Sequence, residues 1–164
     1  MLTHVGSDNQ PRMVDVGNKL ATHRLARAQA RVRLPAEVAE KLRGAGHMTP
    51  KGPVLTTANL AGVMGAKATP QLIPLCHPLM LERCRVDLTV DGDEIVIICE
   101  VGCHGTTGVE MEALTGATIA ALTVYDMCKA MSHDIEIHDV RLLHKSGGKR
   151  DVDVPDPNQS ADKS

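Results

Sequence analysis

A long apolar segment near the C-terminus constrains the fold more than any other part of this sequence. From about Val109 to Met131 the residues suit a helix, and between Ala113 and Cys128 the only charged side chain is Asp126. A helix that is apolar on all sides is normally buried, and a carboxylate in it costs several kcal/mol unless it is paired or hydrogen-bonded. The segment therefore predicts a buried helix whose single charge needs a partner.

Lys129 is the natural partner for this charge. It follows Asp126 by three residues, which places both side chains on the same part of a helix surface. Two interpretations remain open at this level, a plain ion pair near a helix end and a functional acid–base pair. Perturbed pairs cluster at functional sites, but structural pairs exist as well.

Composition excludes several classes of protein. The 164 residues suffice for one domain, and without Trp or Phe and with Tyr125 alone the core must be aliphatic. Single-stranded nucleic acid is usually held by stacking on aromatic rings, and a net charge of −2 gives no basic footprint. We therefore expect no nucleic-acid partner, and an RNA-binding module of this size is excluded.

The sequence also predicts a cytoplasmic location. No apolar run reaches the length of a membrane-spanning helix, and the N-terminus lacks the cationic and apolar regions of a secretory signal. The five cysteines are odd in number and show no tight framework, which fits reduced thiols. No membrane association is expected.

Residue periodicity gives the expected order of elements. Alternating apolar residues predict strands, prolines at 35 and 53 open two early helices, and Asp91-Gly92-Asp93 joins a hairpin. The loop Gln71–Leu81, which contains two prolines, should be rigid. The expected elements are strands Arg24–Leu34, Arg83–Val90, Glu94–Val101 and Ile135–Leu143, and helices Pro35–Arg43, Pro53–Ala68 and Val109–Met131.

This order predicts an α+β fold of the ferredoxin-like split β-α-β kind. Four strands would form an antiparallel sheet with the helices packed on one face. The other face would remain partly apolar, which favours oligomerisation. We expect a loose segment over residues 1–12, a single catalytic domain over 13–150 and a disordered tail over 151–164, where the residues are mostly polar.

The start of the long helix contains two acidic residues of different expected roles. Thr107 and Glu110 have the spacing of a capping box, so we discount Glu110 as catalytic. Glu112 has no such structural role and lies on the side nearest Asp126. A glycine-rich turn before a helix can also hold an anion, although this signal alone is weak.

Two further segments contain residues of chemical interest. His77 lies between prolines in an apolar loop, which suits either an acid–base or phosphate contact or a buried structural histidine. Lys145-Ser146-Gly147-Gly148-Lys149 can cradle phosphate through lysines and backbone NH groups, or it is a flexible basic terminus. The pairs Cys76-His77 and Cys103-His104 make a weak case for zinc without a CxxC motif, so no metal site is expected.

Taken together, several of these segments resemble the cyclic pyranopterin monophosphate synthase family, the molybdenum cofactor biosynthesis protein C family. The resemblance runs from about Met13 to Lys149, and LCHP, GVEMEALT and YDMCKA are very specific in this order. The matching stretches are Met13–Val16, Lys51-Gly52, Leu72–Leu79, Thr107–Thr115, Ala120–Ala130 and Arg141–Lys149.

The resemblance implies a phosphorus–oxygen lyase of molybdenum cofactor biosynthesis. The implied reaction converts cyclised dihydro-GTP (3',8-cyclo-7,8-dihydro-GTP) into cyclic pyranopterin monophosphate and releases pyrophosphate. The implied assembly is a homohexamer, a trimer of dimers, with sites at a subunit interface. No cofactor is required in this interpretation, and the sequence does not decide whether Mg²⁺ assists.

The resemblance also implies roles for individual residues. Asp126, Lys129 and Lys51 would be catalytic. The implied substrate-binding residues are Leu75, Cys76, His77, Met111, Glu112, Lys145, Arg24 and Lys149. A desolvated lysine beside an aspartate suits proton transfer, and local cations suit a triphosphate. The alternative is a non-catalytic nucleotide- or pterin-binding oligomer of the same fold, which would bind GTP-like ligands without turnover.

Overall fold

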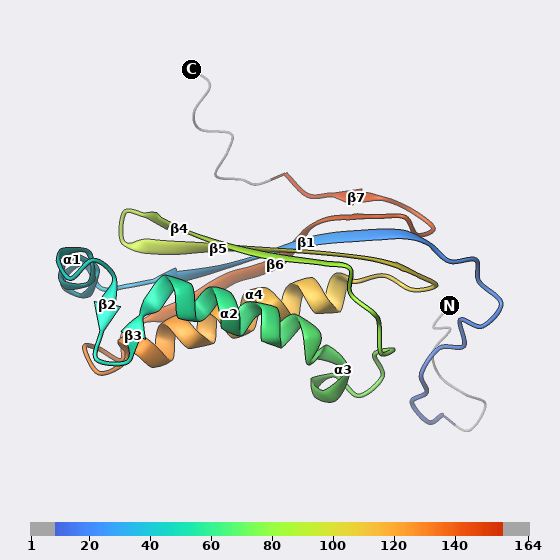
Figure 1. Ribbon diagram of the computed structural model, residues 1–164, viewed down its shortest axis with the longest axis horizontal. Helices are drawn as coiled ribbons and strands as arrows, with labels where there is room; N and C mark the ends of the chain where they lie inside the picture. The colour runs from blue at the N-terminus through green and yellow to red at the C-terminus, as the bar shows by residue number, and fades with distance from the viewer. Residues whose placement is uncertain (1–8, 156–164) are drawn as a thin grey trace, which may run out of the picture.

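The structure is a computed structural model that describes residues 9–155, so most of the expected loose N-terminal segment and of the tail lies outside it. Its elements form a main sheet with helices beneath it and a separate two-stranded hairpin of β2 and β3 (Figure 1). The strands are β1 (Thr22–Arg33), β2 (Met48–Thr49), β3 (Gly52–Pro53), β4 (Arg83–Asp91), β5 (Glu94–Gly105), β6 (Glu136–Ser146) and β7 (Val152–Asp153). The helices are α1 (Ala36–Gly44), α2 (Val54–Lys67), α3 (Thr69–Leu72) and α4 (Glu110–Cys128).

The main sheet is antiparallel and has the order β4-β5-β1-β6-β7. Its four long strands and the helices packed on them confirm the predicted α+β architecture. The helices between β1 and β4 form the crossover, which places β4 beside β5 at the edge of the sheet rather than beside β1. The prediction of only four strands is wrong. After the turn at Gly147, which has φ +88°, the chain returns along β6, and Val152 pairs with Lys145. The short strand β7 therefore extends the sheet into the segment predicted as a tail.

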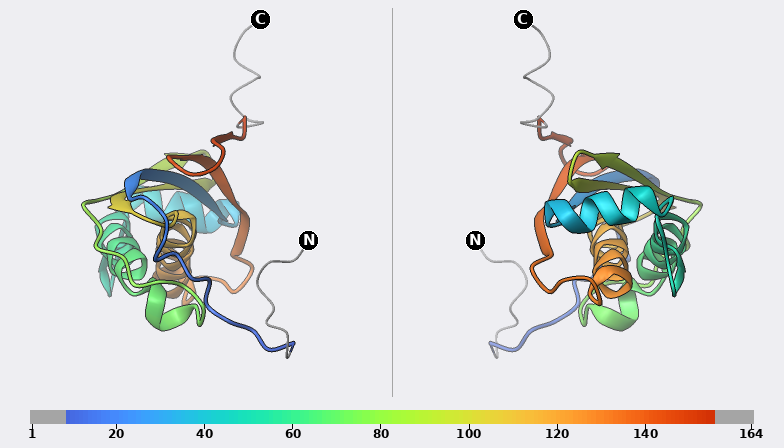
Figure 2. Two further views of the ribbon diagram at one scale, coloured as in Figure 1. Left: turned by 90° about the vertical axis from the view of Figure 1, so that its right-hand side faces the viewer. Right: turned by 90° about the vertical axis from the view of Figure 1, so that its left-hand side faces the viewer.

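Helices α2 and α4 cover one face of the sheet, and Figure 2 shows both on the same side. Small residues let the two helices approach closely. A Cβ built on Gly116 of α4 would lie 3.1 Å from the Gly62 carbonyl oxygen of α2, and one on Gly65 of α2 would lie 2.8 Å from the Ile119 side chain of α4. The core beneath β1 is aliphatic as predicted, with Ala26 and Ala28 fully buried. None of the helices in the described range is long and apolar enough to span a bilayer.

The opposite face of the sheet is charged rather than apolar, contrary to the sequence-based expectation. Arg31 and Arg33 of β1 both pair with Glu94 of β5, and Arg33 also pairs with Glu136 of β6. Period-two alternation directs the arginines of β1 to this face while its alanines enter the core.

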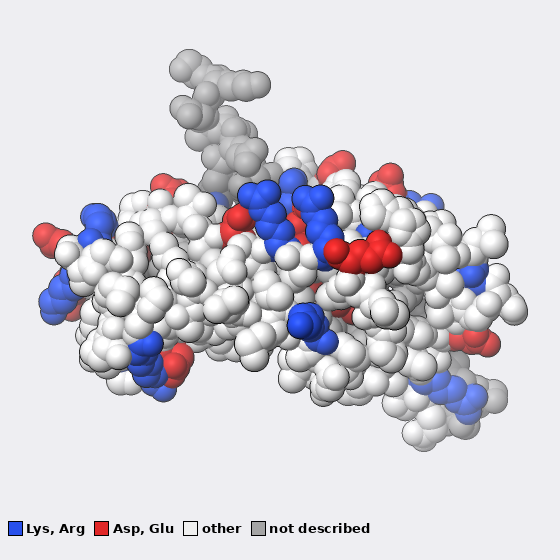
Figure 3. Space-filling model, viewed as in Figure 1, with Lys and Arg blue, Asp and Glu red and all other residues white. Residues whose placement is uncertain are grey.

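Exposed apolar side chains lie instead on the helix layer. They include Leu60 and Met64 of α2 and Leu122 of α4. Figure 3 shows a broad, largely uncharged area over α2. A protein that docked on the helix layer would therefore bury more exposed apolar area than one that docked on the free face of the sheet.

Candidate active site

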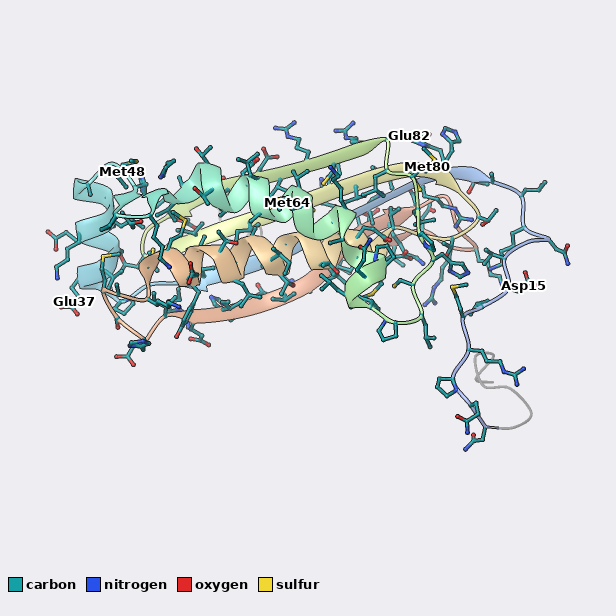
Figure 4. All side chains as sticks on the ribbon, turned by 60° about the horizontal axis from the view of Figure 1, so that its bottom comes forward. Asp15, Glu37, Met48, Met64, Met80 and Glu82 are labelled. Atoms are coloured by element: carbon teal, nitrogen blue, oxygen red, sulfur yellow. The ribbon has the colours of Figure 1, made fainter. Side chains whose placement is uncertain are left out.

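The residues predicted for the site gather in two groups at opposite ends of α4. One group, which we call the Asp126 cluster, consists of Asp126, Lys51 and Lys129. The other lines two adjoining hollows at the start of α4, which we call the turn pocket and the basic basin. In Figure 4, Met48 of the β2–β3 hairpin, which also contains Lys51, lies at the opposite end of the molecule from Asp15, which stands between the pocket-lining Val14 and Val16.

The Asp126 cluster joins a hairpin to the end of a helix. Lys51 occupies the turn between β2 and β3, where its backbone NH donates to Thr49 Oγ1 over 3.2 Å. Its Nζ donates to Asp126 Oδ2 over 2.7 Å and to the Asp126 carbonyl oxygen over 3.1 Å. Lys129 Nζ lies 3.0 Å from Asp126 Oδ1. The carboxylate is therefore held between two ammonium groups, of which sequence spacing revealed one.

The expectation of a buried Asp126 is wrong for the single chain, because its side chain is 51% exposed. It lies in the last turn of α4, where the helix ends at Cys128 and no longer has neighbours on every side. Hydrogen bonds from Lys51 and from Lys129 hold the pKa of the Asp126 carboxyl below its ordinary value. The group is therefore an anion at neutral pH, beside two proton donors.

The turn pocket has a volume of about 260 Å³ and contains five of the residues that the resemblance implies for substrate binding, Leu75, Cys76, His77, Met111 and Glu112. One nitrogen of His77 lies 2.7 Å from the carbonyl oxygen of Val14, which ties the N-terminal segment to the loop after α3. The pocket combines apolar walls with a few polar groups. Its lining residues are Val14, Val16, Lys19, Leu75, Cys76, His77, Thr107, Gly108, Glu110, Met111 and Glu112.

Glu112 is the most perturbed acid of the pocket. Its residue is 3% exposed, and burial raises the pKa of its carboxyl, with a further contribution from the nearby charge of Glu110. Burial and the charge of Glu112 also raise the pKa of the Cys76 thiol, which is therefore neutral at pH 7. An acceptor in a poorly solvated pocket is suited to bind neighbouring NH donors of a ligand.

The predicted capping box is absent from the start of α4. Val109 is the N-cap residue and no side chain caps the helix. Glu110 turns instead toward β6, where its Oε1 accepts a hydrogen bond from Lys145 Nζ over 2.7 Å. A charged donor from a neighbouring strand competes successfully with a neutral backbone NH, because the charge-assisted bond is stronger. Glu110 therefore lines both hollows, although sequence reasoning had discounted it.

The basic basin adjoins the turn pocket and has a volume of about 440 Å³. Arg24, Lys145 and Lys149, predicted as phosphate contacts, all line it. Lys19 and Arg150 also line the basin. The sequence alone did not single them out, although each lies close to a stretch that resembles the family. The close approach of β6 to β1 requires Gly147, since a Cβ there would collide with the His23 carbonyl oxygen.

The two groups cannot act on one small molecule within a single chain. Glu112 and Asp126 are fourteen residues apart on α4, which at the rise of a helix separates them by about 21 Å along its axis. Each end of α4 therefore holds part of the predicted residue set.

Comparisons with known proteins relate the chain to one group of enzymes. Residues 13–148 match the MoaC family. Cyclic pyranopterin monophosphate synthase of Xanthomonas oryzae pv. oryzae is 52% identical over 152 residues, which cover 92% of each chain. The protein of the same name from Xanthomonas campestris pv. campestris is 51% identical with the same coverage. Molybdenum cofactor biosynthesis protein 1 of Drosophila melanogaster is 52% identical over 158 residues, which cover 95% of this chain and 28% of the fly protein.

Proposed function

This chain belongs to the MoaC family, and from that premise we propose that its two separated groups of residues are halves of one active site. The activity is that of a cyclic pyranopterin monophosphate synthase in molybdenum cofactor biosynthesis. The proposed substrate is cyclised dihydro-GTP, and the proposed products are cyclic pyranopterin monophosphate and pyrophosphate. The observation that carries this assignment is a buried acceptor, Glu112, in a pocket that opens onto a basin of cations.

The turn pocket is proposed to hold the base of the substrate. Glu112 accepts hydrogen bonds from adjacent NH groups at the guanine-like edge, as a carboxylate in a poorly solvated site can do strongly. Leu75 and Met111 supply apolar contact for the flat ring of the base, in a chain without Phe or Trp. Cys76 and His77 complete the wall, and the hydrogen bond to Val14 holds the imidazole in place.

The basic basin is proposed to hold the triphosphate. Arg24, Lys145 and Lys149, joined by Lys19 and Arg150, neutralise its charge without a resident metal ion. Mg²⁺ prefers oxygen ligands, and the carboxylate among the lining residues, Glu110, already binds Lys145 over 2.7 Å. We therefore propose that no cofactor is required and that Glu110 positions Lys145 until the phosphates arrive.

The Asp126 cluster is proposed to move the protons of the rearrangement. Such a conversion requires proton transfer at ring nitrogens and ribose hydroxyls, and positioned acids and bases contribute about 10²–10⁴ in rate. Asp126 is held as a base between two lysines, each of which can donate a proton to the substrate. Burial of this cluster on assembly would remove the solvent that now reaches it and would strengthen the attraction between the carboxylate and the two ammonium groups.

A second copy of the chain is proposed to bring the halves together. Glu112 and Asp126 lie about 21 Å apart along α4, so a twofold interface that sets one copy's turn pocket against the other's Asp126 cluster forms two complete sites. The exposed apolar side chains of α2 and α4 favour such burial. We propose a homohexamer built as a trimer of these dimers, in a reducing, cytoplasmic compartment that suits five free cysteines.

Activity assays test the residue assignments. The purified protein is incubated with the cyclised GTP intermediate, and the release of pyrophosphate and the formation of the pterin product are both measured. We expect turnover by the unaltered chain and a loss of at least about 10² in kcat for Asp126→Ala and Lys129→Ala. Asp134→Ala removes an exposed aspartate outside the cluster and serves as the matched control. Full activity of folded Asp126→Ala protein would refute the catalytic assignment, and binding of the intermediate without turnover by the unaltered chain would favour the non-catalytic alternative.

Mixing two inactive variants tests the composite site. Asp126→Ala and Glu112→Gln damage opposite halves, so a mixed dimer contains one site with both changes and one intact site. With random pairing across a twofold interface about half of the dimers are mixed, and one of the two sites in each is intact. The mixture should therefore recover about one quarter of the original activity. A mixture of Asp126→Ala with Lys129→Ala damages the same half and should stay inactive. If subunit exchange is verified by mass spectrometry and the first mixture stays inactive, the site lies within one chain.

A further inference from the structure

Two histidines and a glutamate from separate parts of the sequence converge at the end of the sheet. His23 of β1 stands directly opposite His104 of β5 in the antiparallel register. Glu82 immediately precedes β4, and its backbone NH donates to the Gly102 carbonyl oxygen over 3.0 Å. Figure 4 shows Glu82 at this end of β4. Strands β1 and β5 and the residue that leads into β4 therefore contribute one side chain each.

The side chains lie close to one another and are exposed. The rings of His23 and His104 stack with centroids 4.9 Å apart, and His104 Nδ1 lies 3.2 Å from Glu82 Oε2. One ligand atom from each of the three residues lies within 4.8 Å of the other two. We propose that His23, His104 and Glu82 form a binding site for a late first-row divalent cation, with Zn²⁺ as the reference ion.

The spacing fits this ion after small side-chain rotations. Tetrahedral zinc with bonds near 2.0–2.1 Å places its ligand atoms about 3.4 Å from one another. In the structure the ligand atoms lie within 4.8 Å of one another, and His104 Nδ1 and Glu82 Oε2 are already 3.2 Å apart; all three side chains are exposed, so rotation of the side chains can close the remaining distance around an ion. The strand backbones beneath them are held by paired hydrogen bonds. Three protein ligands leave a fourth tetrahedral position for water or another donor.

The ligand types select the class of metal. Two imidazoles with one carboxylate favour Zn²⁺, Ni²⁺ or Cu²⁺ over Mg²⁺ and Ca²⁺, which prefer oxygen alone. The adjacent arginines are engaged elsewhere. Arg24 donates to the Gly105 carbonyl oxygen over 3.2 Å, and Arg83 pairs with Glu100 over 2.6 Å. The carboxylate of Glu82 therefore faces an imidazole rather than a guanidinium, which leaves it available to a metal.

A bound ion would link three strands beside the turn pocket. Thr107, three residues after His104, lines both hollows, and Arg24, next to His23, lines the basic basin. An ion here would stabilise the folded state in proportion to its concentration relative to the dissociation constant. The proposal does not rest on the enzymatic function, because its ligands lie outside the residues assigned to the substrate.

Metal titration of the full chain tests the site. Protein freed of metal with a chelator is titrated with Zn²⁺ in competition with a chromophoric chelator, and we expect one ion per chain. His23→Gln and His104→Gln should each weaken binding by at least about tenfold, since loss of a group that only orients a metal ligand already costs about 10–100-fold. Glu82→Gln keeps the shape of the side chain and should weaken binding as well. His133→Gln removes an exposed histidine elsewhere and should bind as the unaltered chain does.

The five cysteines offer competing ligands, which a spectroscopic probe distinguishes. Co²⁺ bound to nitrogen and oxygen gives visible ligand-field bands without the intense thiolate-to-cobalt charge-transfer band. We expect the first pattern, and its loss in the His23→Gln/His104→Gln double variant, whose fold is checked by circular dichroism. A thiolate band, unchanged binding by the double variant, or the absence of a bound ion at micromolar Zn²⁺ would each overturn the proposal.

Discussion

Lys51 Nζ lies 2.7 Å from Asp126 Oδ2, a contact between residues 75 positions apart in the chain. It joins the small β2–β3 hairpin to the last turn of α4, and Lys129 binds the other carboxylate oxygen from the same helix. The local ion pair visible in the sequence is thus half of a cluster. Long-range pairing turns it into an anion held by two ammonium groups, an arrangement suited to the proton transfer that we propose for it.

The pKa of Asp126 should rise when a lysine is removed. In Lys51→Ala the strongest hydrogen bond to the carboxylate is lost, so its pKa moves up toward the ordinary value of 3.8. The native carboxyl has a lowered pKa, so it stabilises the fold above the unfolded pKa, and this contribution disappears as pH falls through the folded pKa. Carbon-detected NMR titration of the side chain measures the shift, with Lys41→Ala as the control. An unchanged titration would show that Lys51 does not contact the carboxylate in solution.

Glu112, proposed to bind the substrate, should lower the free energy of unfolding at neutral pH. Its pKa is raised by burial, so the protonated form stabilises the fold below the unfolded pKa, and that stability is lost as pH rises through the folded pKa. Glu112→Gln should therefore unfold at higher denaturant than the unaltered chain at pH 7, and the difference should vanish near pH 4. The same change should raise KM for the cyclised intermediate so far that the variant shows no measurable turnover at the substrate concentration of the mixing assay. Denaturation curves at several pH values check the first effect, and a destabilised variant at pH 7 would contradict it.

The contact between α2 and α4 should tolerate no added methyl group at Gly116. A Cβ there would meet Cys99 Sγ at 2.6 Å and the Gly62 carbonyl oxygen at 3.1 Å, so Gly116→Ala should cost about 1–3 kcal/mol of the free energy of unfolding. Gly44 at the end of α1 has open space around it, and Gly44→Ala should be neutral or stabilise by about 0.4–1 kcal/mol. Urea denaturation of both variants makes the comparison, and equal effects would argue against close packing of the two helices.

The turn after β6 should require Gly147 for the shape of the basic basin. Its φ of +88° is unfavourable for other residues, and an added Cβ would collide with the His23 carbonyl oxygen. Gly147→Ala should therefore displace Lys145 and Lys149 and raise KM by about tenfold or more, while kcat falls less. Gly148→Ala meets only the flexible end of Arg24, at 3.0 Å, and should have a small effect. Similar KM values for the two variants would contradict this role of the turn.

Local chemistry made the elements predictable. The alternation of alanine and arginine along β1, the prolines before α1 and α2, and the Asp-Gly-Asp turn between β4 and β5 are signals contained in a few adjacent residues. The capping box failed for the opposite reason. Thr107 and Glu110 have the right spacing, but Lys145 arrives from β6, 35 positions later, and binds Glu110 more strongly. No local window contains that competitor.

The sequence by itself determined the order of elements, the aliphatic core and the identity of most residues proposed for the site, because these depend on periodicity and on specific short motifs. Only the tertiary structure decided where those residues lie. It exposed Asp126 at the end of α4, bound it to Lys51, separated it from Glu112 and brought His23, His104 and Glu82 together. Strand register and helix length set these distances, and both arise from contacts between segments that are remote in the chain.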